Sequence, residues 1–346
     1  MSQVTICSLS ISLAMVPSMK SIALGLLALL MAAACGLFMC EVFGPEHVVA
    51  QAAPVGGSND IAPDEPQNEP TVVNVSVWVI EVGKVDTSSG VFTADFYLTL
   101  FSDEPMGPQR LEFMNAVDTS IDEYLDEPTR KEYRVHATLA SDLDLSRYPF
   151  DRQRLTIELE DQQATEETQL YRADVDESGL DPTVAVPGWT LDDWQVYLTE
   201  SAYPSGGEDV YYTRYNFVIL VHRPVGSGIL KTVLPALIIV GAGLLSLLLS
   251  PDKGLQRLAL ATGAFIPAVL FHINQTASLP PLGYLTMADR FMVVNYFALM
   301  LTILSTLIIL YYMDKGRTAA AYRVHKVAQI VIPVLWVGLL VLNFLL

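Results

Sequence analysis

One segment in the second half of the chain combines polar side chains with a regular apolar face. Residues 257–278 include Thr262, His272 and Gln275, and polar groups at membrane depth usually face a bundle interior or a water-filled path. A spacing of three or four residues places small and branched side chains on one helical face. In a symmetric pore this face would form an apolar ring that stops ions by excluding water, whereas in a monomeric bundle it would be ordinary core. The face consists of Ala259, Gly263, Ile266, Leu270, Ile273 and Ala277.

Carboxylates form two clusters in the first half of the chain. Carboxylates that lie close together can respond to protons, and their oxygens are ligands that Ca²⁺ accepts. Runs of charge are also typical of a solvated surface. A surface role without any sensing function is therefore the alternative interpretation. The clusters are Asp122, Glu123, Asp126 and Glu127, and then Glu158, Glu160, Asp161, Glu166 and Glu167.

Motifs of enzyme chemistry are missing from the sequence. The five histidines form no His-x-x-His pair, and there is no nucleophile motif or glycine-rich phosphate loop. The three cysteines, Cys7, Cys35 and Cys40, all lie near the N-terminus, so the rest of the chain has no thiol for a disulfide, a metal or a nucleophile. We therefore expect no enzyme activity, no metal site and no cofactor.

Charge is divided unevenly along the 346 residues. Residues 53–228 contain 33 Asp and Glu against 11 Lys and Arg, a net charge of −22, whereas residues 229–346 contain 3 against 8, a net charge of +5. The second part consists largely of apolar runs. This division excludes a wholly soluble protein and argues against a nucleic-acid binder, which needs basic residues facing phosphates.

The N-terminal segment, residues 1–52, has the layout of a signal peptide. Lys20 precedes an apolar run at residues 22–43, and Ala50-Gln51-Ala52 offers a small-x-small cleavage site. An uncleaved anchor is the alternative. Residues 53–70, rich in Pro, Gly, Asp and Glu, are expected to form a disordered linker.

The acidic part has the pattern of strands. Apolar residues alternate from Val73 to Val79, and a turn at residues 86–90 leads to a second alternating run. Shorter runs of the same kind follow at residues 132–139, 154–159, 190–199 and 211–222. We expect residues 71–224 to form an all-β, immunoglobulin-like antiparallel sandwich outside the cytoplasm.

Four apolar stretches follow, each long enough for the roughly 20 residues of a bilayer span. The connection after the first carries Lys253 and Arg257, and the connection after the third carries four basic residues between 315 and 326. The positive-inside rule places both connections in the cytoplasm, and the β domain and the C-terminus outside a plasma or inner membrane. The all-α domain at residues 225–346 has expected helices at 229–250, 257–278, 284–313 and 320–346.

Several short motifs occur in a characteristic order. Tyr148-Pro149-Phe150-Asp151 lies between two predicted strands, ahead of the first span. The chain resembles the pentameric ligand-gated ion channels, which include nicotinic, glycine and GABA-A receptors and bacterial relatives without the Cys-loop disulfide. Ser141 and Leu155 occupy the positions of that disulfide, as in the prokaryotic branch. The other matching residues are Gly188, Trp189, Arg223, Pro235, Arg257, Leu279, Pro280, Tyr284 and Asp289.

The resemblance implies a homopentamer in which the second span of each subunit lines the pore. Ile266 matches the mid-pore gate of the family, and Leu270 and Ile273 lie one and two turns further out. Gln256 and Arg257 match the cytoplasmic mouth. Pro267 is not typical of the family; it removes a backbone donor.

The resemblance also implies a set of residues that couple the β domain to the pore. Asp151 would pair with Arg223, and Asp86 in the first hairpin turn is the nearest candidate for a further acidic partner. A static ion pair is the simpler interpretation. The remaining members are Tyr148, Pro149, Phe150, Leu279 and Pro280.

The family's ligand pocket is matched less well. In amine receptors aromatic faces form a cage around a cation, but Gln162 stands here where those receptors carry Trp. Ordinary sandwich packing is the alternative role for the aromatic candidates. The possible pocket residues are Phe96, Gln162, Tyr203, Tyr211 and Tyr212. The stimulus would be an unknown small ligand, protons or a divalent cation.

Two features of the sequence favour opposite ion selectivities. The charge of the β domain would concentrate cations, but Gln256 stands where cation-selective relatives usually carry Glu. We expect cation conduction. Membrane lipids, inorganic ions and further copies of the chain are the expected partners, without nucleic acid. The competing hypothesis is a non-conducting membrane sensor with the same fold.

Overall fold

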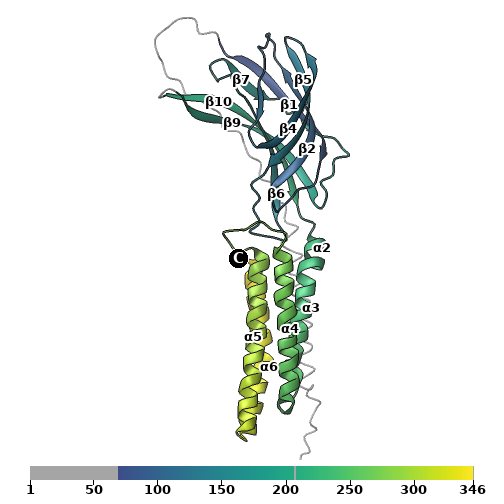
Figure 1. Cartoon of the computed structure of the whole chain (residues 1–346), viewed down its shortest axis with the longest axis vertical. Coiled ribbons are helices and arrows are strands. Elements are labelled where there is room, and N and C mark those ends of the chain that lie inside the picture. Colours follow the sequence, from purple (N-terminus) through teal and green to yellow (C-terminus); the bar gives the residue numbers. More distant parts are fainter. Residues whose placement is uncertain (1–68, 206–207, 346) are drawn as a thin grey trace, which may run out of the picture. The chain divides into compact units, whose positions relative to one another are not determined.

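The computed structural model describes residues 69–205 and 208–345, which are coloured in Figure 1. The predicted signal segment, with its three cysteines, and all but the last two residues of the predicted linker lie outside the described residues. The described chain forms two compact units. One contains the β strands, the chain through Leu234 and His272–Asp289; the other contains Pro235–Phe271 and the chain from Arg290 onward.

The first unit is built around a β-sandwich (Figure 1). Its strands are β1 Thr71–Val82, β2 Val91–Phe101, β3 Leu111–Phe113, β4 Ala116–Asp126, β5 Arg130–Ala140, β6 Arg152–Asp161, β7 Gln169–Ala173, β8 Gly179–Leu180, β9 Thr190–Ser205 and β10 Glu208–His222. The six-stranded sheet has the order β4-β5-β2-β1-β7, with β8 paired to β1. The four-stranded sheet has the order β3-β6-β10-β9. The predicted sandwich is confirmed.

Alternation of apolar and polar residues produces the core between the sheets. Successive side chains of a strand point to opposite faces, so every second residue of β1 and β2 faces inward. Val77 of β1 and Leu98 of β2 are register partners, and both are fully buried. The opposite sheet contributes Leu155, Ile157, Leu159, Phe217 and Ile219.

Two features of the sandwich differ from the sequence expectation. β1 pairs in parallel with β7 and β8, so the sandwich is not wholly antiparallel, because the chain crosses between sheets after β6. There are also additional strands, β3, β4, β7 and β8. The longest of them, β4, carries the acidic residues Asp122, Glu123 and Asp126. Most of its residues are exposed, so no apolar alternation marks it in the sequence.

Within residues 69–205 and 208–345, four helical segments have the length and composition to cross a membrane: Val225–Leu248, Pro251–Thr276, Met287–Asp314 and Thr318–Leu345. The chain is therefore a multi-pass membrane protein. Its helical elements are α2 Val225–Gly228, η1 Ile229–Val233, α3 Leu234–Leu244, η2 Leu245–Leu248, η3 Pro251–Lys253, α4 Gly254–Thr276, α5 Met287–Asp314 and α6 Thr318–Leu345.

The third span begins at Met287, three residues later than the sequence suggests. Thr286 and Asp289 explain this start. The Thr286 N–H donates to Asp289 Oδ2 (2.8 Å), and the Asp289 N–H donates to Thr286 Oγ1 (3.1 Å). This reciprocal pair is a capping box, which satisfies N–H groups that have no helical partner.

Small residues allow close packing in the helical unit. A Cβ added to Gly243 of α3 would lie 2.5 Å from Leu299 of α5 and 2.8 Å from Ala264 of α4. Such small-residue contacts let helix backbones approach closely in membranes. A polar contact links α5 to α6, where Trp336 Nε1 donates to Asn295 Oδ1 (2.9 Å) and both side chains are buried.

Candidate functional site

The helix α4 has one buried and one exposed face. Its buried face is formed by Gly254, Arg257, Ala261, Ala264 and Ala268. All six residues of the predicted pore face are exposed in the subunit: Ala259, Gly263, Ile266, Leu270, Ile273 and Ala277. Ile266, Leu270 and Ile273 are 65%, 55% and 57% exposed. A soluble surface would not favour such large apolar side chains, so this face is suited to contacts with other chains, lipid or a pore.

Two adjacent residues at the start of α4 have different environments. Gln256 is exposed, whereas Arg257 is completely buried. Arg257 Nη1 donates to the carbonyl of Leu249 (2.6 Å) and lies 2.8 Å from His325 Nδ1 on α6. Arg257 therefore fastens α4 to α6 and to the end of the first span, and it does not point to the exposed face.

The end of β10 carries an ion pair inside the β unit. Arg223 Nε donates to Asp151 Oδ1 (2.7 Å), and the Asp151 side chain is fully buried. Gln153 Nε2 donates to the other carboxylate oxygen of Asp151 (2.7 Å). The Arg223 guanidinium also lies over the rings of Trp189 (4.3 Å) and Tyr148 (5.1 Å), a geometry that favours cation–π attraction.

Trp189 and Gln153 were not among the predicted coupling residues. The only signal for Trp189 was the Gly188-Trp189 pair before a strand, and Gly188 has a φ of +86°, which favours glycine. Burial raises the pKa of Tyr148. The tyrosine hydroxyl therefore stays neutral beside Arg223.

The loop between α4 and α5 contacts the loop that contains Tyr148. The Tyr284 hydroxyl accepts from the Leu145 N–H (3.0 Å). At the start of α5, the Met287 N–H donates to the carbonyl of Ser146 (2.8 Å), and the Ala288 N–H donates to that of Tyr148 (3.0 Å). Carbonyls of the Tyr148 loop thus satisfy donors at the N-terminus of α5.

Pro149 and Phe150 lie close to the start of the first span. A Cβ added to Gly228 would lie 2.7 Å from the Phe150 ring and 3.1 Å from the Pro149 carbonyl. Leu279 and Pro280 line a pocket of about 360 Å³ that also includes His272. These contacts bring most of the predicted coupling residues into one region of the β unit.

Asp86 lies in the β1–β2 turn. Its carboxylate accepts from the Ser88 and Ser89 hydroxyls (both 2.8 Å) and from the Ser88 N–H (3.0 Å). These bonds lower the pKa of Asp86 to about 2. In the part of the chain that the structure describes, the Asp86 carboxylate has no bond to Arg223. The turn instead reaches the α4–α5 loop through Thr87, which donates to the carbonyl of Ser278 (3.4 Å).

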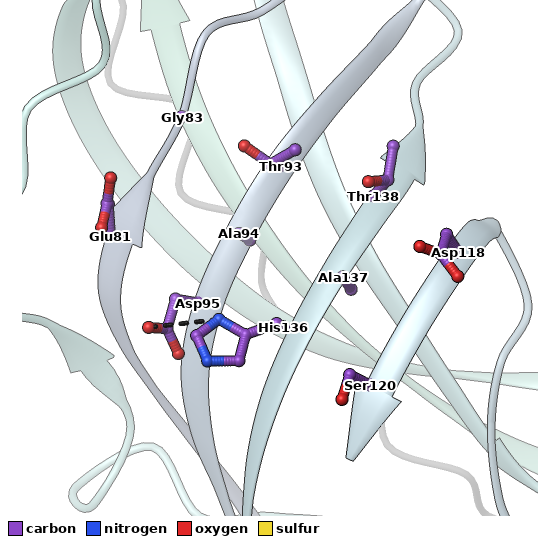
Figure 2. Close-up of a pocket in the computed structure, with 10 residues that line it drawn as sticks. All are labelled: Glu81, Gly83, Thr93, Ala94, Asp95, Asp118, Ser120, His136, Ala137 and Thr138. Carbon is purple, nitrogen blue, oxygen red and sulfur yellow. Dashed lines mark ion pairs between the residues drawn. The ribbon is translucent and has the colours of Figure 1, made fainter. Parts of the chain in front are cut away.

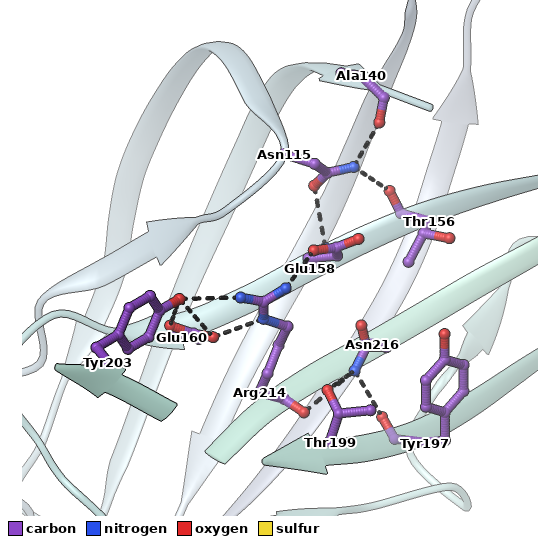
Figure 3. A network of polar contacts seen from close by, with 10 residues as sticks. All are labelled: Asn115, Ala140, Thr156, Glu158, Glu160, Tyr197, Thr199, Tyr203, Arg214 and Asn216. Carbon is purple, nitrogen blue, oxygen red and sulfur yellow. Dashed lines mark hydrogen bonds and ion pairs between the residues drawn. The ribbon is translucent and has the colours of Figure 1, made fainter. Parts of the chain in front are cut away.

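The β9–β10 hairpin carries a polar network that Figure 3 shows. Arg214 Nε donates to Glu160 (2.6 Å), Nη1 to Glu158 (2.9 Å) and Nη2 to the Tyr203 hydroxyl (3.0 Å). Burial by itself would lower the pKa of Arg214, but its bonds to Glu160, Tyr203 and Glu158 raise it overall. The ring of Tyr212 packs edge-on against Tyr203. Arg214, a cation of the chain itself, is therefore bonded to Tyr203, one of the possible pocket residues.

The structure corrects the assignment of Phe96 to the ligand pocket. Phe96 is fully buried and packs edge-on against Phe113, 5.5 Å away in the sandwich core. A shift of one residue along a strand changes the face of the sheet, so its exposed neighbour is Tyr97. Tyr211 and Gln162 are exposed.

A second polar pocket, of about 300 Å³, lies on the six-stranded sheet (Figure 2). Asp95 of β2 and His136 of β5 are register partners in it, and His136 Nδ1 lies 3.3 Å from Asp95. Arg134 donates two bonds to Asp95 (2.8 and 3.2 Å), which raise the pKa of Arg134. The sequence analysis did not single out these residues, although their strands were predicted.

Several members of the acidic clusters, Asp161 above all, accept local hydrogen bonds. Asp161 accepts from the backbone N–H groups of Arg110, Gln163 and Ala164 (all 2.8 Å). Within residues 69–205 and 208–345, no group of three or more His, Cys, Asp and Glu side chains is arranged to hold a metal ion.

Comparison with known proteins identifies relatives along most of the chain. The chain is 21% identical over 317 residues to the proton-gated ion channel of Gloeobacter violaceus, covering 82% of this chain and 85% of the relative. It is 23% identical over 276 residues to the acetylcholine-gated chloride channel subunit acc-1 of Caenorhabditis elegans, covering 70% and 58%. It is also 23% identical over 161 residues to the gamma-aminobutyric acid receptor subunit beta-4 of Gallus gallus, covering 46% and 32%. No protein-family model matches the chain.

A β-sandwich followed by four apolar helices defines a membrane receptor of the ligand-gated channel fold. The chain belongs to the pentameric ligand-gated ion channels of the Cys-loop superfamily. The predicted family is therefore confirmed. Its relatives are ion channels, so the chain is a channel subunit and not an enzyme.

Proposed function

We propose that five copies of this chain form a homopentameric channel in the plasma or inner membrane, with α4 of each subunit lining the pore. The observation that carries the proposal is the exposed face of α4. Five of the six predicted pore residues lie on it and the sixth, Ala277, follows the helix directly, while the opposite face is buried by the other helices. The β domain (residues 71–224) and the C-terminus of the membrane domain (225–346) would lie outside the cytoplasm.

The gate would be the apolar part of this face. Ile266, Leu270 and Ile273 are each more than half exposed in one subunit. Five such side chains around an axis form a constriction that water leaves when it is narrow, which blocks ions. The small residues Ala259 and Gly263 would leave the cytoplasmic end wider.

Coupling would pass through the contacts around Arg223. The Asp151–Arg223 pair anchors the end of β10 immediately before the first span. The same loop caps α5 through the carbonyls of Ser146 and Tyr148. A movement of the sandwich would therefore be transmitted both to the first span and to the α4–α5 loop.

Protons are the stimulus that the site favours. An amine agonist would have to displace Arg214, which already occupies the region of Glu158, Glu160 and Tyr203. Protonation of either carboxylate would weaken its bond to Arg214 and loosen the β9–β10 hairpin. The Gloeobacter relative is named a proton-gated channel. A small ligand that does not need an aromatic cage is the second candidate, supported by the exposed Tyr211.

The channel would favour cations. The net charge of −22 on residues 53–228 raises the local concentration of cations at the outer entrance. Gln256 is exposed at the predicted cytoplasmic mouth but carries no charge. Selectivity would therefore arise mainly from the field of the β domain and from the pore wall.

The experiment is reconstitution of the purified protein in planar bilayers under a KCl gradient. The external pH is stepped from about 8 to about 4, a range that spans the titration of histidine and carboxylate side chains. We expect a current that appears on acidification, with a reversal potential near that of K⁺. A current insensitive to pH would reject protons as the stimulus, and a reversal potential near that of Cl⁻ would reject cation selectivity. A pentamer that stays silent with ligands as well would favour the non-conducting sensor.

A further inference from the structure

The polar pocket on the six-stranded sheet collects ionisable side chains from four strands (Figure 2). Glu81 of β1, Asp95 of β2 and His136 of β5 form one row across the sheet, because Glu81 pairs with Asp95 and Asp95 with His136. Ser120 of β4 continues this row, and Asp118 lines the pocket two residues away on the same strand. Three carboxylates and one imidazole therefore line a single hollow of the β unit.

The backbone of β1 brings Glu81 to this pocket. The register of β1 and β2 shifts just before Glu81, which leaves Ile80 unpaired and sets Glu81 opposite Asp95. Such a bulge redirects the side chains of its strand. Gly83 then allows a close approach of the two strands, because a Cβ at this position would clash with Thr93 Oγ1. The pocket therefore depends on the backbone of the sheet as well as on its side chains.

Asp95 is the centre of the arrangement, and its carboxylate contacts two basic groups at once. Arg134 Nε donates to Oδ1 (3.2 Å) and Nη2 donates to Oδ2 (2.8 Å), while His136 Nδ1 lies 3.3 Å from the same Oδ2. The side chain of Asp95 is only 11% exposed, whereas that of His136 is 51% exposed and can exchange protons with solvent. The bonds to Asp95 raise the pKa of Arg134. The guanidinium therefore keeps its charge, and His136 is the basic partner whose charge changes with pH.

We propose that His136 is a proton-sensing residue of the channel, whose imidazolium forms a charged pair with Asp95 and competes with Arg134 for the shared oxygen. The inference rests on the proposed function, because it names a group that takes up protons when the external solution is acidified. Hydrogen bonds of charged groups are roughly twice as strong as those of neutral groups. Protonation therefore turns the long contact between His136 and Asp95 into a strong attraction.

The charges around His136 are compatible with this pair. Besides His136, the ionisable groups that line the pocket are carboxylates on β1, β2 and β4: Glu81, Asp95 and Asp118. Arg134 is two residues away on β5, and its register partners are Tyr97 of β2 and Asp122 of β4. An imidazolium at residue 136 therefore faces three carboxylates, and the cation beside it is already bound to Asp95.

The pocket is connected to the turn that reaches the α4–α5 loop. The Gly83 N–H donates to the carbonyl of Thr93 (2.8 Å), so the membrane-proximal ends of β1 and β2 are joined at the pocket. The turn that follows Gly83 contains Thr87, which donates to the carbonyl of Ser278 (3.4 Å). A change in how β2 is held at Asp95 would therefore act on the hairpin that contacts this loop.

The direction of the effect follows from linkage between proton binding and opening. A channel that opens on acidification must bind protons more tightly in its conducting state. The ordinary pKa of histidine is about 6.5, against about 4.3 for glutamate. A histidine sensor would therefore extend the response to a higher pH than carboxylate sensors alone, and its removal should make activation require more acid.

The test compares the pH of half-maximal current in planar bilayers for the wild-type full chain and three variants. His136→Gln removes the titrating group, and His136→Arg keeps a positive charge at every pH. Thr138→Val is the matched control, because it changes a neutral side chain of the same strand that lines the same pocket. Size-exclusion chromatography checks the assembly of each protein.

We expect His136→Gln to shift half-activation to lower pH by about 0.5 pH unit or more, because the ordinary pKa of the remaining carboxylate sensors is about two units below that of histidine. His136→Arg should shift it to higher pH, and Thr138→Val should leave it unchanged. Shifts of opposite sign distinguish an effect of charge from damage to the sheet.

The inference is overturned, and the proton-gated channel left intact, if either His136 variant shows no shift or both shift in the same direction. An equal shift in Thr138→Val and His136→Gln also overturns it. Each His136 variant is sufficient to contradict the inference, so the test stays decisive if one of them fails to assemble. A wild-type current that does not respond to acid overturns the proton stimulus and this inference together.

Discussion

Arg223 is held by contacts of two kinds, and this is the best-defined site at the residue scale. The buried carboxylate of Asp151 binds its Nε, while Trp189 and Tyr148 lie against its guanidinium. A charge with this many partners has few alternative positions. The end of β10 is therefore rigidly connected to the Tyr148 loop, as a coupling element requires.

Replacing Asp151 by Asn removes the negative partner but keeps the size of the side chain. Breaking a buried ion pair costs about 3–5 kcal/mol. We expect a loss at the lower end of this energy range, because Arg223 keeps its aromatic contacts. The midpoint of thermal unfolding should therefore fall by about 5 °C or more. Tryptophan fluorescence of the full chain during heating measures it. Asp176→Asn, an exposed carboxylate, is the control; equal midpoints for both variants would show that the pair does not stabilise the fold.

Asp86 illustrates a carboxylate that cannot be the proton sensor. Its folded pKa of about 2 lies below the ordinary value of 3.8. At a pH above the ordinary pKa of 3.8, ionised Asp86 therefore stabilises the turn. This contribution to stability is lost only as the pH falls through the folded pKa of about 2. The proposed acidification down to about pH 4 should therefore leave its charge unchanged.

The measurement is the ¹³C shift of the Asp86 carboxyl as a function of pH, assigned with Asp86→Asn. We expect no titration of this resonance down to about pH 4. Ser88→Ala should raise the pKa, since it removes one of the bonds that lower it. Ser120→Ala, in another strand, should leave it unchanged. A titration near pH 5 in the wild type would contradict the bonding of this turn.

At the scale of elements, α4 separates two roles on opposite faces. Arg257 fastens the helix from its buried face, and Gln256 is exposed. Arg257→Ala leaves the acceptors on Leu249 and His325 without this donor and creates a cavity. Each hydrogen bond to a charged group contributes about 1.5–3 kcal/mol to stability. We therefore expect a lower thermal midpoint for Arg257→Ala and an unchanged midpoint for Gln256→Ala. The same tryptophan fluorescence measures both, and a larger loss in Gln256→Ala would reverse the assignment of the faces.

The exposed face of α4 yields a prediction for the gate. Ile266→Ser would make the proposed constriction wettable and should raise the spontaneous current about tenfold or more. Removing an Ile side chain from water is worth about 2 kcal/mol, and about 1.4 kcal/mol corresponds to a tenfold change in an equilibrium constant. The current is recorded in planar bilayers at neutral pH. Leu307→Ser, at an exposed position of α5, is the control. If a correctly assembled Ile266→Ser pentamer has unchanged current, the pore assignment is wrong.

At the scale of the whole molecule, the separation of charge predicts how selectivity responds to salt. Five β domains, each with a net charge of −22 over residues 53–228, would create a negative potential at the entrance. The Debye length falls from about 30 Å at 0.01 M to about 10 Å at 0.1 M salt. We therefore expect the K⁺/Cl⁻ permeability ratio to fall when the salt concentration is raised on both sides and the ratio of the two concentrations is kept constant. Reversal potentials measure it; a constant ratio would locate selectivity entirely in the pore wall.

The sequence predicted those features that depend on local periodicity. Alternation from Val73 to Val79 indicated a strand, and the spacing from Ala259 to Ala277 indicated one face of a helix, because periods of two and 3.6 residues are properties of neighbouring positions. The β-sandwich was predicted correctly on this basis, and the family was predicted correctly from the order of short motifs that begins with Tyr148-Pro149-Phe150-Asp151. The acidic strand β4 was missed, since its exposed residues carry no such period.

The tertiary structure decided which distant residues meet. Phe96 is buried and Tyr97 is exposed because the register of β2 in the sheet selects the face, and one residue of difference reverses it. Trp189 and Tyr148 lie against Arg223, and Arg214 is bonded to Glu158 and Glu160, although these partners are far apart in the chain. Residue types along the chain determined the elements, the charge separation and the membrane spans. Contacts between remote side chains depend on strand pairing and helix packing, which no local pattern encodes.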